Sequence, residues 1–267
     1  MENLNLNEKS IIYYLKQYRV KKQLKFYPET NSTNDVAKQL CREGKGKGVL
    51  VAVDFQLAGK GRQGRSFYSP KGKGIYFSAV YELNQNNKNL ELISSAAGLA
   101  VRDTLYNIFN LDAKIKWPND IFVDGKKICG ILCEVVNEGN TPKYVVVGIG
   151  LNVEKTEFPT ELEYIATSIG NVYSGGVELD HNEILVDIVN NLDRYIIRSG
   201  LITGGDCSEI VSRLKAHSSI IGEMVRVHTN DAEYDAKVLD IDENGALVVK
   251  GPVDIHTITS GEVQRIV

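Results

Sequence analysis

A basic, glycine-rich stretch in the first third of the chain has the residue types needed to hold an anion. Residues Gly59–Gly74 read GKGRQGRSFYSPKGKG and contain five glycines and five basic side chains in sixteen residues, with no acidic one. Glycine lets a backbone approach a ligand closely, and arginine supplies planar paired donors for phosphate or carboxylate. The stretch therefore indicates an anion-binding loop that uses Lys60, Arg62 and Arg65. A solvated basic loop or a nucleic-acid-binding patch fits these residues equally well.

Two common phosphate-binding motifs do not account for this stretch. The segment from Gly59 to Gly64 matches G-x-G-x-x-G, but that fingerprint requires a helix to begin at the glycine turn. Here the chain continues through Phe67, Pro70 and two more glycines into an apolar, β-type run. No G-x-x-x-x-G-K-[ST] motif occurs. Neither a Rossmann fold nor a P-loop is expected.

A second constellation begins at KWPND, Lys116 to Asp120, and continues to Lys127. Taken alone, the pentapeptide is typical of a turn. Lys127 opens the apolar run KICGILCE, in which Gly130 permits close approach of another group. A lysine fixed at the start of a strand beside a basic loop is suited to neutralising a carboxylate or a phosphate, whereas a single exposed lysine is commonly only solvated.

The elements that must position these residues can be read from hydrophobic periodicity and turn residues. Strands are expected over 24–30, 48–56, 74–83 and 143–153, and a hairpin turning at Asp124-Gly125 is expected within 121–136. Helices are expected over 8–21, 32–44, 92–109, 181–198 and 206–216. The basic stretch then falls in a loop between two strands. Strands and helices alternate without a strict βαβ rhythm, which predicts an α+β fold with a mixed sheet.

The pattern of apolar and turn-forming residues changes after His217. About five short strands follow, with turn signals at Asn230-Asp231, at 243–245 and at Gly251-Pro252. This pattern is typical of a small β-barrel. We therefore expect two domains, residues 1–217 and residues 218–267.

Composition excludes several classes of protein. Of the 267 residues, 43% are apolar and 24% charged, as in ordinary globular proteins. The net charge of −3 argues against a protein whose main role is to wrap nucleic acid. The start of the sequence has no signal-peptide pattern, and no apolar run approaches the roughly 18 residues of a membrane span. A cytoplasmic protein is expected.

The four cysteines and four histidines do not form a metal or nucleophile motif. Cys129 and Cys133 lie on one face of an expected strand but roughly 13 Å apart, too far to bridge or to share a metal. Cys41 and Cys207 are isolated, so free thiols in a reducing compartment are expected. The histidines lie outside every motif and are interpreted as surface or structural residues.

Five motifs, in this order and spacing, resemble those of the biotin protein ligases: ETNSTND, DFQLAGKGRQGR, IKWPND, GKKICGILCE and VVVGIGLNV. The resemblance covers roughly residues 24–266 and includes the small β-barrel, which it implies to be SH3-like. It implies a monofunctional biotin–[acetyl-CoA-carboxylase] ligase: an enzyme that converts biotin and ATP to biotinyl-5′-AMP and then biotinylates a lysine of a carrier domain. About 24 residues precede the motifs, too few for the helix-turn-helix domain of some members, so specific DNA binding is not expected. Members also dimerise through an exposed sheet edge, so monomer and homodimer both stay open.

The resemblance also implies a role for each matching residue. The loop that closes over biotin and the adenylate matches Gly59, Lys60, Gly61, Arg62, Gly64 and Arg65. The biotin pocket matches Ser32, Thr33, Asn34 and Gln56, with Gly130. Lys127 matches the lysine that contacts the biotin carboxylate and the α-phosphate, and with Arg62 and Lys60 it forms the expected catalytic set. The nucleotide side is expected at Lys116, Trp117, Asn119, Asp120, Asn152 and Tyr164, with Asp120 also placed near Mg²⁺.

Two positions depart from the family pattern. The loop usually reads G-R-G-R-x-G-R, and Lys60 replaces its first arginine, which keeps the charge but loses the paired donors. Near LEYIAT, where relatives can carry an adenine-stacking tryptophan, this chain offers Tyr164. Two rival functions remain: a lipoate or octanoate ligase, and a nucleic-acid-binding module that uses the basic loop.

Overall fold

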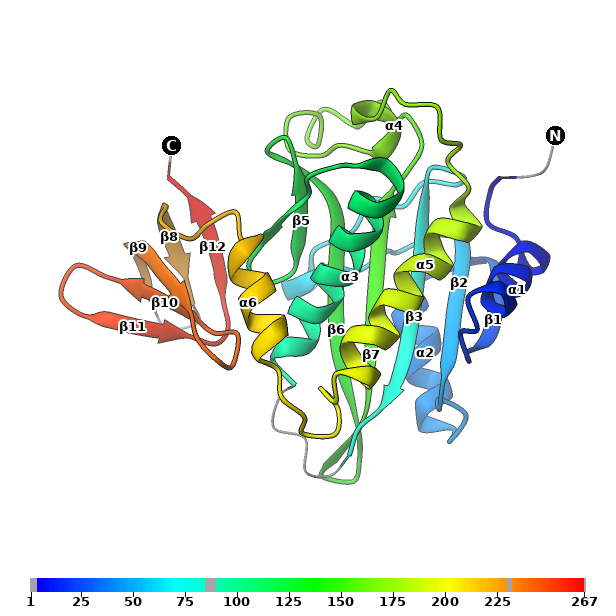
Figure 1. The fold of residues 1–267 in the computed structure, drawn as a ribbon, viewed down its shortest axis with the longest axis horizontal. Coiled ribbons are helices and arrows are strands. Elements are labelled where there is room, and N and C mark those ends of the chain that lie inside the picture. The colour runs from blue at the N-terminus through cyan, green and yellow to red at the C-terminus, as the bar shows by residue number, and fades with distance from the viewer. Residues whose placement is uncertain (1–3, 85–89, 230–231, 267) are drawn as a thin grey trace.

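The computed structural model describes residues 4–84, 90–229 and 232–266, and it has the expected α+β architecture (Figure 1). Its larger sheet has seven strands in the order β1-β2-β3-β7-β6-β5-β4. The β1–β2 pair is parallel and the other neighbouring pairs are antiparallel, so the sheet is mixed. In chain order the strands are β1 (Gln23–Thr30), β2 (Val49–Gln56), β3 (Gly74–Glu82), β4 (Lys114–Lys116), β5 (Asp120–Val123), β6 (Lys126–Glu138) and β7 (Thr141–Asn152).

Helices cover both faces of this sheet. The long helices α3 (Leu92–Phe109) and α5 (His181–Asp193) lie on one face, and α2 (Thr33–Arg42) lies on the other (Figure 1). Strand β2 shows why both faces are filled: Leu50 belongs to the core under α3 and α5, while its neighbour Val51 belongs to the core under α2. Alternate side chains of a strand point to opposite faces, so a continuous apolar run produces two cores.

The remaining helices complete this layer. Helix α1 (Glu8–Gln17) packs on α5 and β1, the one-turn α4 (Ile169–Val172) follows β7, and α6 (Ser208–Ala216) leads to the second sheet. None of the helices in the described ranges is long and apolar enough to cross a membrane.

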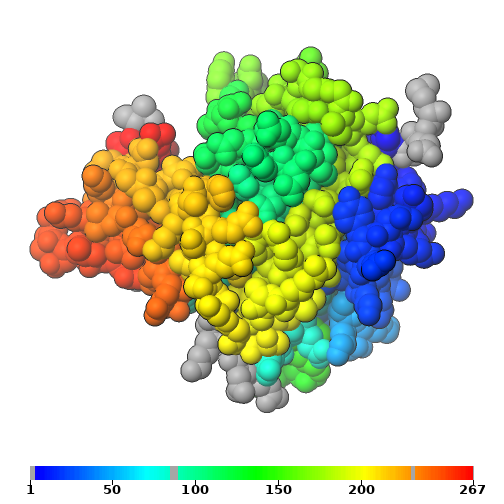
Figure 2. Space-filling model, viewed as in Figure 1, coloured from blue at the N-terminus to red at the C-terminus, as the bar shows by residue number. Residues whose placement is uncertain are grey.

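The second sheet is antiparallel and forms a lobe at one end of the molecule (Figure 2). Its strand order is β11-β10-β9-β8-β12. The strands are β8 (Met224–His228), β9 (Glu233–Ile241), β10 (Leu247–Lys250), β11 (Ile255–Ile258) and β12 (Glu262–Arg265). The five expected strands are therefore present, and an SH3-like barrel is compatible with them. The expected turn at Asn230-Asp231 lies outside the described residues.

The second sheet is joined to the rest of the chain by direct contacts of turns and of α6. Trp117 donates a hydrogen bond from Nε1 to the Gly245 carbonyl at 3.0 Å, and Lys215 pairs with Asp240 at 2.7 Å. Residue Ile115 of β4 exchanges backbone hydrogen bonds with residues 217 and 219. The division at 217/218 stays a prediction.

Most expected elements are found, with small differences at their ends. The β5–β6 hairpin turns at Asp124 and Gly125, which both have positive φ as a tight two-residue turn requires. The first helix ends at Gln17 instead of residue 21, because Arg19 is left-handed (φ 55°). The helix expected over 181–198 is α-helical to Asp193 and continues as the π-helical turn η2 (Arg194–Arg198).

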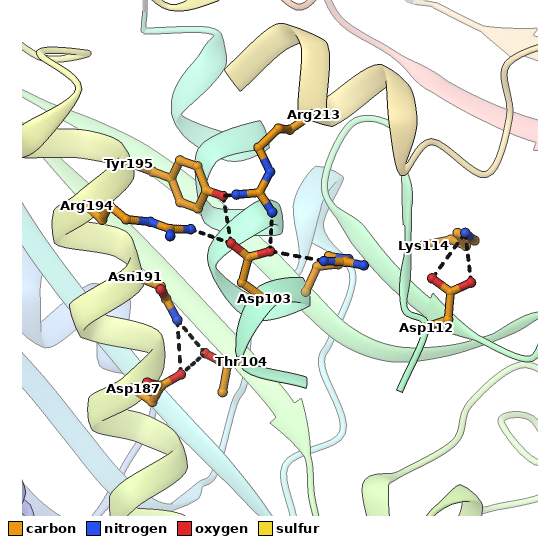
Figure 3. A network of polar contacts seen from close by, with 10 residues as sticks. Asp103, Thr104, Asp112, Lys114, Asp187, Asn191, Arg194, Tyr195 and Arg213 are labelled. Carbon is orange, nitrogen blue, oxygen red and sulfur yellow. Dashed lines mark hydrogen bonds and ion pairs between the residues drawn. The ribbon is translucent and has the colours of Figure 1, made fainter. Parts of the chain in front are cut away.

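A buried carboxylate organises the helices where this turn occurs. Asp103 of α3 is 4% exposed and accepts hydrogen bonds from Tyr195 and Arg194 of η2 and from Arg213 of α6 (Figure 3). Arg102 adds a fourth contact at 3.3 Å. The π turn coincides with the point where two consecutive side chains both reach this carboxylate.

Candidate active site

Most of the predicted site residues meet in a cavity of about 120 Å³ between the start of α2, the basic loop and strands β6 and β7. Its lining is Ser32, Thr33, Asn34, Gln56, Lys60, Gly61, Arg62, Arg65, Ser66, Phe67, Asn119, Asp120, Lys127, Gly130, Ile131, Leu132, Gly148, Ile149, Gly150 and Glu262. Four of these side chains are cationic and two are carboxylates. The excess of positive charge suits an anionic ligand.

One end of the cavity is lined by uncharged polar side chains, of which Ser32, Thr33 and Asn34 are buried and Gln56 is half-buried. The backbone N–H of Thr33 donates to Gln56 Oε1 at 2.9 Å. Ser78 Oγ lies 2.7 Å from Thr33 Oγ1 and 2.6 Å from Asn34 Oδ1. Asn34 Nδ2 in turn donates to Glu134 Oε2 at 2.8 Å. Satisfied buried networks of this kind hold donors and acceptors in one geometry.

The floor of the cavity is made of glycines. A Cβ at Gly150 would overlap the ring of Phe67, a Cβ at Gly130 would lie 3.0 Å from the same ring, and a Cβ at Gly148 would overlap the Asn34 amide. Gly148 and Gly150 lie two apart on β7 and share a face, so this part of the sheet has no side chains. Phe67 and Asn34 therefore pack directly on backbone.

The other end of the cavity is cationic. Lys127 Nζ lies 2.7 Å from Asp120 Oδ1, and Arg62 Nη1 donates to Asn119 Oδ1 at 3.3 Å. Asn119 is itself fixed on β6, because it exchanges hydrogen bonds of 2.8 and 3.0 Å with Ile131. The backbone of Lys127 is held as well, since its N–H donates to Ile165 and its carbonyl accepts from Thr167.

The basic stretch forms the loop that was expected between β2 and β3. It contains a short 3-10 turn, η1 (Arg62–Gly64), in which Gln63 and Gly64 have positive φ. Lys60 pairs with Asp35 of α2 at 2.6 Å, and Arg65 pairs with Glu262 of β12 at 2.6 Å. The loop is thus attached both to α2 and to the second sheet.

A second, larger cavity of about 620 Å³ adjoins the first and shares the loop as a wall. It is bordered by the start of α3, by Trp117-Pro118, by Cys133 and Glu134 of β6, and by residues 245, 246 and 259 of the second sheet. Burial raises the pKa of the Cys133 thiol to about 12, so it is not a thiolate nucleophile at neutral pH.

Four predicted residues line neither cavity. Gly59 packs against Phe67 and Ser69, where a Cβ would overlap them. Asn152 is nearly buried and donates to the Thr167 carbonyl at 2.9 Å. Lys116 lies over the Phe122 ring. Burial lowers the pKa of the Lys116 amine, and the nearby Asp120 carboxylate opposes this shift only in part. Tyr164 is 77% exposed, and its role as an adenine-stacking residue stays a prediction.

The other predicted residues line a cavity, together with several neighbours that were not predicted. Gly64 and Trp117 line the second cavity only, and the rest line the first. Phe67, Ser78 and Glu262 were not singled out. The glycines of the GIG segment, Gly148 and Gly150, were not predicted to line the cavity. Their spacing of two residues in a strand was the available signal for a face without side chains.

The cysteines and histidines agree with their expected roles. All four cysteines are free thiols. His181 is fully buried beside Glu154, and no histidine is among the described residues that line either cavity. In the part of the chain that the structure describes, no cluster of three or more His, Cys, Asp or Glu side chains could hold a metal.

Comparison with known proteins places the chain in a family. Residues 26–152 match the model of the Biotin/lipoate A/B protein ligase family, and residues 220–265 match the Biotin protein ligase C terminal domain. A Biotin–[acetyl-CoA-carboxylase] ligase from Paracoccus denitrificans is 31% identical over 88% of this chain and 97% of its own length. The Bifunctional ligase/repressor BirA of Bacillus subtilis is 29% identical over 97% of this chain and 79% of its own length.

The fold agrees with these sequence matches. The structure of a biotin protein ligase from Aquifex aeolicus in complex with biotin and ATP superposes with a TM-score of 0.78 and 27% identity, covering 92% of this chain and 99% of that one. A sheet with a glycine floor, a basic loop and a C-terminal β-domain thus occur together in a chain that belongs to the biotin protein ligases.

Proposed function

We propose that this enzyme activates biotin with ATP to biotinyl-5′-AMP and then transfers the biotinyl group to a lysine of a carrier domain. The observation that carries the proposal is a single cavity with a fixed neutral polar end at Ser32–Asn34 and a cationic end at Lys127 and Arg62. Biotin has a neutral ureido group at one end and a carboxylate at the other. The two ends of the cavity match these two groups in chemistry.

In the first step, the biotin carboxylate attacks the α-phosphorus of ATP; a C–O–P bond forms and pyrophosphate leaves. Both reactants are anions. Lys127 and Arg62 reduce their repulsion and stabilise the charge that develops on the α-phosphate oxygens. Because Lys127 is held through its backbone and its ion pair with Asp120, its amine is preorganised for this role.

In the second step, the lysine amine of the carrier attacks the acyl carbon, an amide forms, and AMP and a proton leave. No enzyme nucleophile is required. Burial raises the pKa of the Cys133 thiol, the one cysteine that lines a cavity among the described residues, which agrees with this chemistry.

Mg²⁺ is proposed to bind with the nucleotide. Mg²⁺ is commonly held by one or two carboxylates together with substrate phosphates. Asp120 is a cavity carboxylate whose buried Oδ1 makes no well-directed hydrogen bond despite its ion pair with Lys127, so it fits that mode. The ion would supply charge neutralisation at the phosphates. The nucleotide itself is proposed to lie near Lys116, Trp117, Asn119 and Asn152, with Tyr164 as the stacking candidate.

The partner is proposed to be the biotin carrier domain of a biotin-dependent carboxylase or decarboxylase; the name of the Paracoccus relative contains acetyl-CoA carboxylase. Beyond Gly130, β6 pairs with β7 and has no second strand partner among the described residues. A second copy of the chain can pair with this open strand edge, and monomer and homodimer are both compatible with it.

We propose a cytoplasmic location. Specific DNA binding is proposed to be absent, and a mobility-shift assay across a range of salt concentrations tests this.

Isothermal titration of biotin and of lipoate, each with and without Mg-ATP, tests the function. We expect tight biotin binding, release of one pyrophosphate per site, and retention of the adenylate. Preferential binding of lipoate would assign the cavity to the rival acid, and binding of neither acid would contradict the proposal.

Replacement of Arg62 by glycine is expected to release biotinyl-5′-AMP from the enzyme roughly 10- to 100-fold faster, because one charged hydrogen-bond donor is lost and the loop is loosened. Free adenylate would then label lysines of unrelated proteins. The measurement is biotin incorporation into a bystander protein present with the carrier. If the variant retained the adenylate as tightly as wild type does, our account of the loop would be wrong.

Replacement of Gly150 by alanine is expected to weaken biotin binding about tenfold or more, because the new methyl group overlaps Phe67 and must displace its ring. Gly176→Ala is the matched control: a Cβ at this position would meet no atom within 4 Å, and its φ is not positive. The measurement is titration of both variants with biotin. Equal affinities would show that the glycine floor does not shape the pocket.

A further inference from the structure

Lys60 lines both cavities, but its ammonium group is bound to a residue on α2. Lys60 Nζ lies 2.6 Å from Asp35 Oδ2, and both side chains are partly exposed. Asp35 is in the first turn of α2, directly after Asn34, whose side chain is part of the polar end of the cavity. One short segment of α2 therefore touches both the ligand cavity and the loop.

Asp35 is itself held by a chain of contacts that reaches the sheet. Lys38 Nζ lies 3.3 Å from Asp35 and 2.6 Å from Glu134 of β6. Glu134 also accepts the 2.8 Å hydrogen bond from Asn34. Burial would raise the pKa of the Asp35 carboxyl, but its hydrogen bonds to Lys60 and Lys38 outweigh this and lower it. Asp35 is thus ionised and fixed at neutral pH.

The loop beyond Lys60 is a compact unit. Lys60 and Ser66 form an isolated antiparallel bridge, and Gly61 donates from its N–H to the Arg65 carbonyl at 2.7 Å. Arg62 lies between these paired positions. A contact that fixes Lys60 therefore restrains Arg62 as well.

We propose that Asp35 is a positioning residue that holds the basic loop over the cavity through Lys60, and that this ion pair lengthens the time for which the adenylate stays bound. The inference rests on the proposed function. It gives Lys60 a role different from that of a direct ligand: its charge serves mainly to anchor the loop on α2. Lys60 stands where the family usually has an arginine. One ammonium group is enough for this contact with a single carboxylate oxygen, so the paired donors of arginine are not needed.

The test is the release rate of pre-formed biotinyl-5′-AMP from wild type, Asp35→Asn, Lys60→Met and the double variant. Partly exposed ion pairs contribute modestly, so Asp35→Asn is expected to speed release about two- to five-fold. The two substitutions should not be additive, because each removes the same contact. The difference between wild type and Asp35→Asn should also shrink at high salt, which screens the pair.

Two controls separate positioning from general damage. Asp35→Glu keeps the charge and should restore slow release. Asp112→Asn removes a carboxylate from another ion pair, 2.9 Å from Lys114 and outside both cavities, and should leave release unchanged.

Either of two results would overturn the inference: additive effects of Asp35→Asn and Lys60→Met, or slower release from Asp35→Asn, which would mean that Asp35 withholds Lys60 from the ligand. Failure of the wild type to form or bind the adenylate would instead contradict the proposed function, so the two failures are distinguishable.

Discussion

Replacement of Lys127 by methionine is expected to lower the rate of biotinyl-5′-AMP formation by roughly 10²- to 10³-fold, the effect typical of removing one preorganised donor from a developing charge. Methionine keeps much of the apolar stem and removes the ammonium group. Asp120, whose carboxylate lies 2.7 Å from Lys127 Nζ, would then face the reacting anions without its partner. Both changes act on the same step, in which two negatively charged groups must meet.

The measurement is pyrophosphate release at saturating biotin and Mg-ATP, with Lys126→Met as the matched control. Lys126 is the preceding residue on β6, but its Nζ donates to the Glu163 carbonyl and it lines neither cavity. The control should retain a rate within a few-fold of wild type. If Lys127→Met did the same, the charge that drives adenylation would have to come from the loop arginines.

The arrangement of the secondary structure could largely be predicted from local signals. Helix α3 begins and ends where its apolar period does, and the β5–β6 hairpin turns at the Asp-Gly pair, because both depend on residues close in sequence. The end of α1 was less predictable. Arg19 adopts a left-handed conformation that no glycine or proline announces.

The cavity residues that could be predicted are those that lie within a recognisable short segment of the sequence. Ser32–Asn34, Gln56 and Lys127 are of this kind, and all of them line the first cavity. The partners that fix them were not found: Ser78 reaches Asn34 from another strand, and Glu134 reaches it from β6. Such contacts depend on strand register, which a single sequence specifies only indirectly.

The sequence also could not tell which partner a charged side chain chooses. Lys60 was expected in the loop over biotin and the adenylate; the loop is there, and the structure pairs the Lys60 amine with Asp35 of the preceding helix. Long side chains on loops have many rotamers of similar energy, so sequence position constrains them weakly.

Replacement of Asp103 by asparagine is expected to lower the free energy of unfolding by about 3–5 kcal/mol, because it leaves buried positive charge without its partner. Asp103 accepts hydrogen bonds from Arg194, Tyr195 and Arg213 (Figure 3). It also pairs with Arg102, whose side chain is 10% exposed. Arg102 Nε already has no hydrogen-bond partner in the described residues. Loss of the carboxylate would remove the only ion pair that this guanidinium makes among the described residues.

The three arginines should not contribute equally, and this inequality makes the prediction testable by urea denaturation. Arg194 is 45% exposed and can turn toward water, so Arg194→Met should cost less than about 1 kcal/mol. Asp112→Asn, in the exposed pair shown in the same view, should change stability by no more than about 0.5 kcal/mol. Because α3, η2 and α6 all meet at Asp103 and α6 leads into the second sheet, its loss should also loosen the contact between the two sheets. Equal costs for Arg194→Met and Asp103→Asn would mean that the network is a surface ion-pair cluster and that packing alone holds these helices together.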